Sequence, residues 1–111
     1  MASIEELIRT IPDFPIKGVM FRDVTTLFGN AKGFQECIER LTTPYKNTKV
    51  DKVIGIEARG FIIGGAIAKE LECGFIPIRK EGKLPGKTIN QDYELEYGKA
   101  TLEIHEDALS A

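Results

Sequence analysis

Apolar side chains recur with helical spacing in three parts of the chain. The first run begins behind Ser3 and Glu6, which have the spacing of a capping box, and it stops at Pro12. The second run follows Asn30, a residue type that caps helices, and the third spans residues 60–71. The three runs predict amphipathic helices. Their apolar positions are Ile4, Leu7, Ile8 and Ile11, then Phe34, Cys37, Ile38 and Leu41, then Ile63, Ile67 and Leu71.

Strand-like patterns surround the third predicted helix. The apolar runs 53–56 and 75–78 flank it and are typical of buried parallel strands, so the order predicts a right-handed βαβ unit. Residues 93–97 and 101–105 alternate between apolar and polar side chains, which predicts a hairpin. Residues 12–29 lack a helical period and predict an extended, loop-rich segment. These elements together predict an α/β fold: an open parallel sheet with flanking helices and a hairpin lid.

The composition predicts a single globular domain over residues 1–111. The chain is 42% hydrophobic and 29% charged. No apolar run approaches the ~20 residues of a membrane helix, and no secretory signal opens the chain, so we expect no membrane association and a cytoplasmic protein. The net charge of −2 is unlike that of a nucleic-acid binder. The predicted subdivisions are a helix and recognition loop (1–29), a helix with the βαβ core (30–78) and a basic loop with the hairpin lid (79–105).

Charge is unevenly distributed along the second half of the chain. Residues 79–88 hold four cations and one anion, whereas residues 91–107 hold six anions and one cation. A basic loop in an acidic protein favours a small anionic ligand over a polymer. The alternative is a solvated loop without a ligand. The four cations are Arg79, Lys80, Lys83 and Lys87.

Cysteine and histidine offer little material for chemistry. Cys37 and Cys73 form no CxxC pair, and His105 is the single histidine, so we expect no metal site on protein side chains. The two cysteines are expected to be buried, reduced thiols. His105 is expected on a strand edge without a catalytic role.

The segment from Gly55 to Phe61 joins a predicted strand to a predicted helix. Ligands of open α/β sheets bind at this end of the strands. The helix start lacks a Ser, Thr, Asp or Asn cap, so its free N–H groups could bind an anion, helped by Arg59. Gly60 would let a ligand approach the backbone. The alternative is an ordinary turn capped by water, with Arg59 paired to a surface carboxylate.

Four segments in the same order resemble motifs of the adenine phosphoribosyltransferases, members of the type I phosphoribosyltransferases. Together they extend over most of the chain. They are FPIKGVMFRDVT at 14–25, EARGF at 57–61, IRKEGKLPG at 78–86, and the hairpin that combines YELEYG at 93–98 with LEIH at 102–105. The resemblance implies a phosphoribosyltransferase-like fold and purine salvage: the phosphoribosyl group of phosphoribosyl pyrophosphate is transferred to adenine, giving AMP and pyrophosphate.

The sequence also departs from the family. The family continues with a third parallel strand that ends in two acidic residues, followed by a Thr-Gly-Gly loop for the 5′-phosphate. Neither an Asp-Asp pair nor Thr-Gly-Gly occurs in these 111 residues. The resemblance therefore implies the amino-terminal part of such an enzyme, truncated before the third parallel strand. We expect little or no transferase activity from the chain by itself, since remote phosphate contacts position the reacting carbon.

The resemblance assigns pyrophosphate binding to the strand-to-helix turn and the basic loop. It also implies a cis peptide between Glu57 and Ala58, a homodimer in which Arg79 serves the neighbouring subunit, and Mg²⁺ bound through the substrate's phosphates. Arg79 could instead be a solvated rim residue. The implied residues are Glu57, Ala58, Arg59, Gly60, Arg79, Lys80 and Lys83.

The same resemblance assigns adenine to the segment Met20, Phe21 and Arg22. Phe21 would stack on the base, or it would be a core residue. Arg22 would take part in binding the base, or it would form an ion pair with Asp23 or contact a helix carbonyl. Glu96 would be a catalytic acid near the base, together with Arg59 at the pyrophosphate, or Glu96 would simply face water.

The lid would be closed by two tyrosines, Tyr93 and Tyr97, or these would be packed strand residues. A different class of function stays open alongside the enzyme. The chain could be a catalytically dead purine-binding or dimerising module of the same fold, or a fragment without function.

Overall fold

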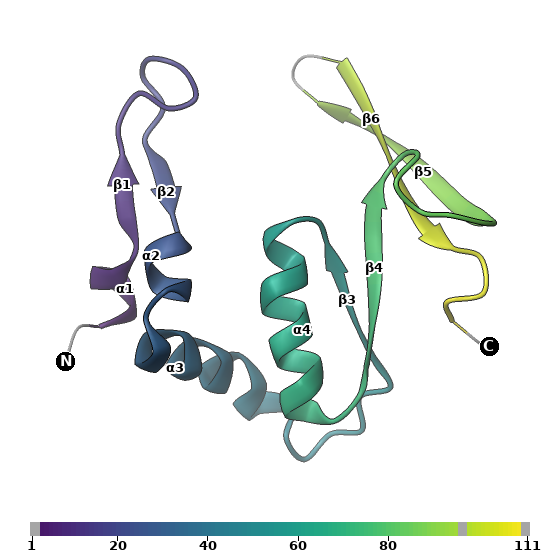
Figure 1. The fold of residues 1–111 in the computed structure, drawn as a ribbon, viewed down its shortest axis with the longest axis horizontal. Coiled ribbons are helices and arrows are strands. Elements are labelled where there is room, and N and C mark those ends of the chain that lie inside the picture. Colours follow the sequence, from purple (N-terminus) through teal and green to yellow (C-terminus); the bar gives the residue numbers. More distant parts are fainter. Residues whose placement is uncertain (1–2, 96–97, 110–111) are drawn as a thin grey trace. The chain divides into compact units, whose positions relative to one another are not determined.

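The computed structural model describes residues 3–95 and 98–109. The chain forms two compact units, residues 1–44 and 45–111, which are drawn together in Figure 1 and are described one at a time below. None of the described helices is both long and apolar enough to cross a membrane. The expectation of one domain over residues 1–111 stays a prediction.

The first unit begins with one helical turn, α1 (Ile4–Leu7), closed by the predicted capping box between Ser3 and Glu6. The prediction of a helix up to Pro12 is wrong beyond this turn. Strand β1 (Arg9–Ile11) follows and pairs antiparallel with β2 (Phe21–Asp23). Apolar residues three apart fit a helix, but they also occur in short strands, and here the pairing with β2 decides between the two.

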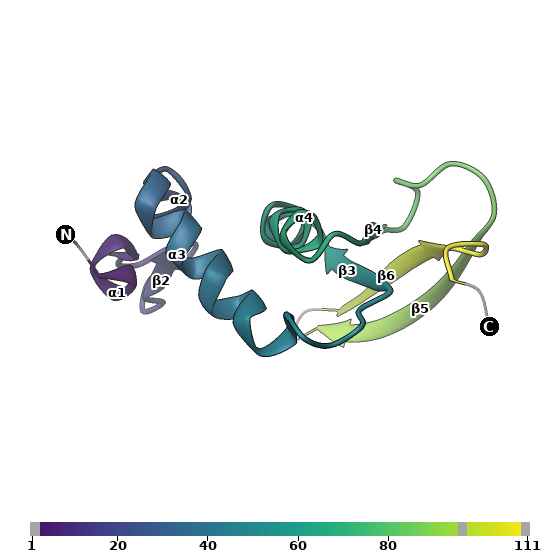
Figure 2. The same ribbon diagram turned by 90° about the horizontal axis from the view of Figure 1, so that it is seen from below.

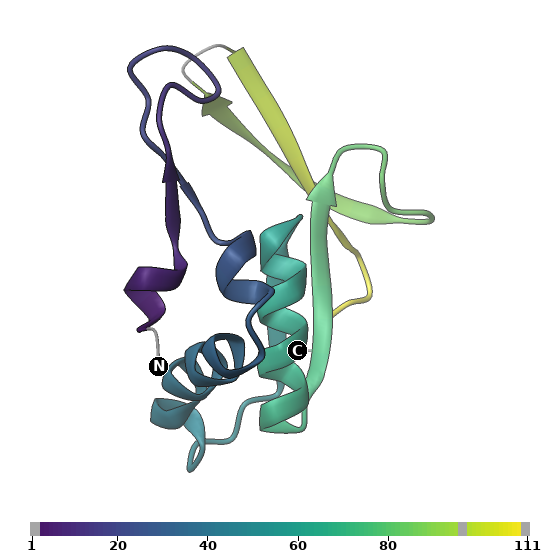
Figure 3. The same cartoon turned by 60° about the vertical axis from the view of Figure 1, so that its left-hand side comes forward.

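The remainder of the first unit is helical. The helix after Asn30 was predicted, whereas the helical turn at residues 25–28 corrects the prediction of an extended, loop-rich segment over 12–29. The short helix α2 (Thr25–Phe28) precedes α3 (Ala31–Thr42), and a 3₁₀ turn (Thr43–Tyr45) ends the unit. The Asn30 side chain accepts a hydrogen bond from the Gly33 N–H at 2.8 Å, which confirms the predicted cap. Figure 3 shows α1 and α2 at the base of the β1–β2 ribbon.

The second unit contains the predicted βαβ unit. Strand β3 (Lys52–Ile56), helix α4 (Arg59–Leu71) and strand β4 (Gly74–Lys80) follow in order, and the two strands pair in parallel with Ile56 opposite Ile78. Helix α4 packs against these two strands and is seen end-on beside them in Figure 2. Gly64 faces Phe75 so closely that a Cβ would lie 2.5 Å from its ring, so a glycine here lets the helix pack close to the sheet.

The predicted hairpin joins the same sheet. Strands β5 (Thr88–Leu95) and β6 (Gly98–His105) are antiparallel, and β6 also pairs antiparallel with β4, giving the order β3-β4-β6-β5. The α/β class, the open sheet, the flanking helices and the hairpin are thus confirmed. The predicted strand bounds are wrong at their starts, since β5 begins at Thr88 instead of residue 93 and β6 at Gly98 instead of residue 101. The sheet is mixed, however, because among the described strands only β3 and β4 run parallel.

Candidate functional site

The turn between β3 and α4 has the predicted geometry. The strand ends at Ile56, the helix begins at Arg59, and Ala58 at the cap position provides no side-chain hydrogen bond. The peptide between Glu57 and Ala58 is cis, as the family resemblance implied. The 13-residue helix therefore begins at the carboxyl end of a parallel strand, and no side chain caps its first N–H groups. Such a helix start attracts anions.

Gly55, rather than Gly60, is the glycine that this turn requires. A Cβ on Gly55 would lie 2.5 Å from the Gly60 carbonyl oxygen and 2.7 Å from the Phe75 ring. A Cβ on Gly60 would meet its nearest atom at 3.5 Å, an ordinary contact. The absence of a side chain at Gly55 thus lets the helix start approach the strand. The predicted role of Gly60, the approach of a ligand to the backbone, stays a prediction.

Glu57, directly after β3, binds Arg79, which lies near the end of the neighbouring strand β4. The Arg79 Nε donates to Glu57 Oε2 at 2.8 Å, and the Glu57 carboxylate also accepts from the backbone N–H of Lys80. The Arg79 hydrogen bond is the main cause that lowers the pKa of Glu57, against the opposing effect of desolvation. The ionised carboxylate of Glu57 therefore holds the Arg79 guanidinium in place.

Arg79 also lies over an aromatic ring. Its guanidinium carbon is 5.7 Å from the centre of the Phe61 ring, within the range of a cation–π interaction. Phe61 in turn packs edge-on against Phe75 at 5.9 Å between ring centres. Glu57 and the Phe61 ring hold this cation in place. The side chain of Arg79 is nevertheless 36% exposed, so part of it is accessible to a ligand.

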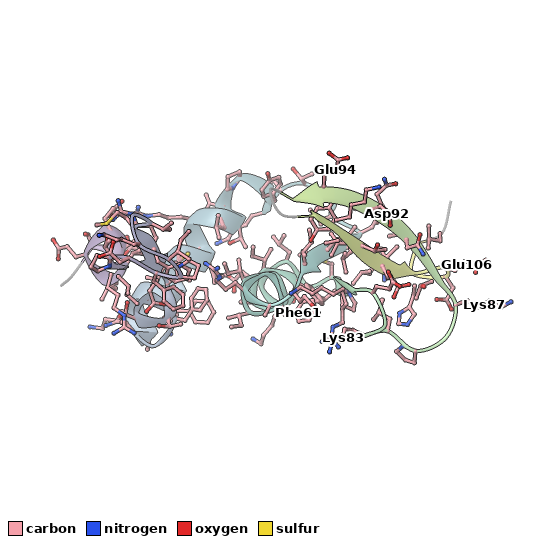
Figure 4. The ribbon with its side chains drawn as sticks, turned by 90° about the horizontal axis from the view of Figure 1, so that it is seen from above. Phe61, Lys83, Lys87, Asp92, Glu94 and Glu106 are labelled. Atoms are coloured by element: carbon pink, nitrogen blue, oxygen red, sulfur yellow. The ribbon has the colours of Figure 1, made fainter. Side chains whose placement is uncertain are left out.

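The other predicted cations lie on the surface. Arg59 is exposed at the first position of α4, Lys80 is exposed at the end of β4, and Lys83 is exposed on the loop 81–87 that follows. Figure 4 shows Lys83 and Lys87 on this loop, with the acidic side chains of Asp92 and Glu94 directed away from it. The basic character of the loop is therefore not cancelled by these two acids.

The predicted adenine segment belongs to the first unit. Met20 is 56% exposed, and the half-buried Phe21 meets Phe14 edge-on at 5.1 Å. The exposed Arg22 donates from Nη1 to the hydroxyl of Thr10 on the paired strand, and not to Asp23 or a helix carbonyl. Phe21 is thus neither a fully buried core residue nor a fully exposed one.

Asp23 forms a constellation that the sequence analysis missed. Its carboxylate accepts from the Thr25 backbone N–H at 2.9 Å, from Arg9 Nε at 2.5 Å and from the Thr25 hydroxyl. These bonds, the Thr25 backbone bond foremost, lower the pKa of Asp23 to about 2. The site ties β1 to β2 and to the start of α2, so its role is structural.

The remaining predicted residues are only partly described. Tyr93 lies on β5 and is 37% exposed, so it is a partly solvated strand residue. The predicted acid Glu96 and the second lid residue Tyr97 lie outside the described residues. Cys37 and Cys73 are free but only half-buried, which corrects the expectation of buried thiols. Within residues 3–95 and 98–109, no group of three or more His, Cys, Asp and Glu side chains could hold a metal ion.

Curated proteins similar to this chain share one name. An adenine phosphoribosyltransferase of Dinoroseobacter shibae is 63% identical over 106 residues, covering 96% of this chain and 59% of that protein. The corresponding protein of Ruegeria pomeroyi is 60% identical over 107 residues, covering 96% of this chain and 60% of that protein. The chain is homologous to adenine phosphoribosyltransferases. It spans about 60% of the length of these relatives, and no family model matches it.

Solved adenine phosphoribosyltransferases share the fold. The enzyme of Thermoanaerobacter pseudethanolicus is 48% identical, with a TM-score of 0.89, covering 95% of this chain and 61% of that one. The enzyme of Giardia lamblia, solved with 9-deazaadenine, is 37% identical, with a TM-score of 0.90, covering 100% of this chain and 64% of that one.

Proposed function

We propose that this chain carries the purine-binding and pyrophosphate-binding part of an adenine phosphoribosyltransferase of purine salvage. The reaction joins adenine to phosphoribosyl pyrophosphate and releases AMP and pyrophosphate. The observation that carries the proposal is the uncapped start of α4 behind the cis peptide, beside the anchored guanidinium of Arg79. The likeness to named relatives at 55–63% identity supports it.

The pyrophosphate would be bound mainly by backbone groups. The N–H groups from Ala58 to Gly60 point out of the helix start, and the dipole of α4 favours a negative charge there. Arg59, Arg79, Lys80 and Lys83 would supply positive charge around it. Because these donors exist before the ligand arrives, they would stabilise the leaving pyrophosphate without reorganisation.

Glu57 has a different role in this proposal from the one first expected. Its carboxylate would repel a phosphate oxygen but holds Arg79 at Nε, which leaves the guanidinium's other N–H groups to meet the ligand. Glu57 is therefore a positioning residue. Arg59, which lies at the helix start, and Arg79 are the side chains that we assign to direct contact with the leaving group.

The adenine would be recognised by the segment Met20–Arg22, where backbone groups can read the base and the exposed Met20 can cover it. Glu96 would act as the general acid at the base, and Tyr93 with Tyr97 would close the hairpin as a lid. The solved relative from Giardia lamblia carries 9-deazaadenine, and the one from Saccharomyces cerevisiae carries adenine. Those ligands support a purine as the acceptor here.

In the last part of the proposal, Mg²⁺ and the homodimer rest on the family resemblance, and the location and the excluded partners rest on composition and charge. Mg²⁺ would arrive on the phosphate oxygens of the substrate and neutralise charge that develops on the leaving pyrophosphate. The protein would be a cytoplasmic homodimer, with Arg79 serving its own subunit or the neighbouring one. Neither nucleic acid nor membrane would be a partner.

The proposal is tested by calorimetric titration of the 111-residue chain with magnesium pyrophosphate, AMP and adenine in separate experiments. Binding of pyrophosphate that is lost in Arg59→Ala is expected. An assay of AMP formation from adenine and phosphoribosyl pyrophosphate runs in parallel. A chain that binds neither pyrophosphate nor adenine would contradict the proposal.

A catalytically dead binding or dimerising module is the second candidate function. The observation that favours it is that neither Asp-Asp nor Thr-Gly-Gly occurs within these 111 residues. Ligand binding without measurable AMP formation would select this candidate. AMP formation at the rate of an ordinary enzyme would exclude it.

A further inference from the structure

One carboxylate holds both ends of the basic loop 81–87. Glu103 in β6 accepts the backbone N–H of Gly82 on Oε1 at 2.8 Å and the hydroxyl of Thr88 on Oε2, also at 2.8 Å. Gly82 is the second residue of the loop, and Thr88 is the first residue of β5 behind it. A single side chain therefore bridges the entrance and the exit of the loop.

His105 holds the same loop near its end. The His105 Nε2 lies 2.9 Å from the Pro85 carbonyl oxygen, and the backbone N–H of Glu106 donates to the Lys87 carbonyl oxygen at 3.0 Å. Glu103 and His105 are two residues apart on β6 and therefore lie on one face of the sheet. An open pocket of about 660 Å³ lies between this end of the loop and the residues that follow β6.

The position of Glu103 links the loop to the candidate anion site. Arg79 stands directly opposite Glu103 in the β4–β6 ladder, so the two side chains share a face of the sheet. The Nε of Arg79 nevertheless donates to Glu57, which follows β3, the neighbour of β4 opposite to β6. Arg79 is thus bound by one glutamate, while the neighbouring glutamate binds the loop.

We propose that Glu103 is a positioning residue that fixes the basic loop, and Lys83 with it, for binding a pyrophosphate group beside the start of α4. The inference rests on the proposed function for the identity of the anion and on the two hydrogen bonds for the clamp. The sequence pattern concealed it, because a glutamate in an alternating strand has the pattern of a solvated side chain.

Charge and positioning make opposite predictions for this residue. Glu103 adds a negative charge near a site for an anion, so on electrostatics alone its removal would tighten pyrophosphate binding. If instead the residue fixes the loop, removal of its two acceptor oxygens weakens binding despite the more favourable charge. The sign of the change therefore separates the two explanations.

Three variants of the 111-residue chain exploit this difference. Glu103→Ala removes both hydrogen bonds. Glu103→Gln removes the charge, yet its amide oxygen can accept from the Gly82 N–H and its NH₂ group can donate to the Thr88 hydroxyl. Glu81→Gln removes the same charge from an exposed loop residue outside the clamp. Two quantities are measured: the amide hydrogen exchange rate of Gly82 by NMR, and the dissociation constant of magnesium pyrophosphate by calorimetry.

In Glu103→Ala we expect Gly82 exchange to accelerate about tenfold and the dissociation constant to rise about tenfold, as for lost bonds to a charged group. Glu103→Gln and Glu81→Gln should bind as tightly as the wild type or more tightly. Equal or tighter binding by Glu103→Ala, or equal weakening by Glu103→Ala and Glu103→Gln, would overturn the proposal.

Thr88→Val covers the case in which Glu103→Ala does not fold, since it removes only one of the two bonds. It should accelerate Gly82 exchange and weaken pyrophosphate binding by a smaller factor, and unchanged values would overturn the clamp.

If the wild type binds no pyrophosphate, the proposed function fails at its anion site. Slow Gly82 exchange that accelerates in Glu103→Ala would then still establish the clamp, and unaltered exchange would refute it.

Discussion

Each unit of the chain contains a carboxylate that binds one arginine and one backbone N–H, and the two arrangements serve different ends. In the first unit, Asp23 binds Arg9 Nε and the Thr25 N–H. In the second unit, Glu57 binds Arg79 Nε and the Lys80 N–H. Both carboxylates are nearly buried, with side-chain exposures of 9% for Asp23 and 13% for Glu57.

The difference lies in what surrounds each arginine. Arg9 is 59% exposed, and its partner Asp23 ties together β1, β2 and the start of α2. Arg79 is 36% exposed, lies over the Phe61 ring and stands beside a helix start without a side-chain cap. An arginine–carboxylate pair therefore stabilises the fold in the first unit. By our proposal, the corresponding pair in the second unit positions a cation that binds a ligand.

Replacing the two arginines tests this comparison most directly. Arg79→Ala should weaken magnesium pyrophosphate binding about tenfold or more, because a charge-assisted hydrogen bond to the ligand is lost. Arg9→Ala, the matched control, should leave that binding unchanged and lower only the thermal stability. The dissociation constants come from calorimetry. Equal pyrophosphate binding by wild type and Arg79→Ala would contradict the proposal that Arg79 binds the ligand.

The backbone that underlies the second arrangement can be broken at Gly55. Gly55→Ala places a Cβ 2.5 Å from the Gly60 carbonyl oxygen, so we expect a loss of about 1–3 kcal/mol in the free energy of unfolding. Urea denaturation measures it. The control Gly65→Ala adds a methyl group in the same region of sequence where nothing lies within 4 Å, and should stabilise helix α4 by up to about 1 kcal/mol. Similar losses in both variants would contradict the close approach at Gly55.

Local pattern predicted most of the second unit, but in the first unit it predicted only the capped start of α1 and helix α3. Helix α4, strands β3 and β4 and the hairpin lie where apolar runs and alternating patterns predicted them. The expected burial of strand 53–56 is wrong in part, because Ile54 and Ile56 are exposed. Strands β1 and β2 have three residues each, too few to carry a period, so Ile8 and Ile11 were assigned to a helix. What decided the outcome was a pairing with residues about a dozen positions away.

The candidate site shows the same division. The turn at 57–60 was found because its residues are contiguous in sequence and resemble a known family. The bonds from Glu57 to Arg79 and from Glu103 to the loop were not found, because each depends on strand register: Ile56 opposite Ile78, and Arg79 opposite Glu103. Register is a property of the folded sheet, and no local spacing of charged residues encodes it.

Acid should loosen the first unit through Asp23. Its pKa of about 2 lies below the ordinary value of 3.8, so ionised Asp23 stabilises the folded state at neutral pH, and this contribution is lost as the pH falls from about 4 toward 2. Asp23→Asn should therefore be less stable than wild type at pH 7 and should approach it near pH 2. Denaturation at several pH values measures this difference.

The control for this titration is Asp51→Asn, which removes an 81% exposed carboxylate whose nearest cation is 4.0 Å away. At pH 7 it should lower the stability far less than Asp23→Asn does, because the Asp51 carboxylate lies in solvent. A carboxyl ¹³C titration of Asp23 with a midpoint near 4 would contradict the low pKa. The Glu57 carboxyl should also titrate below its ordinary value of 4.5, because Arg79 binds its ionised form.

The smallest effect is expected where an arginine–carboxylate pair lies in water. Arg40 Nη2 donates to Glu36 Oε1 at 2.7 Å one helical turn away on α3, with side-chain exposures of 61% and 42%. Arg40→Gln should cost only about 0.3–0.5 kcal/mol, since solvent screens the pair. A double-mutant cycle with Glu36→Gln in urea denaturation isolates this coupling. Lys32→Gln, at the opposite end of the same helix, should cost nothing or stabilise slightly, because a cation there opposes the helix dipole. A coupling above about 1 kcal/mol would mean that burial is not what separates Asp23 and Glu57 from an ordinary surface pair.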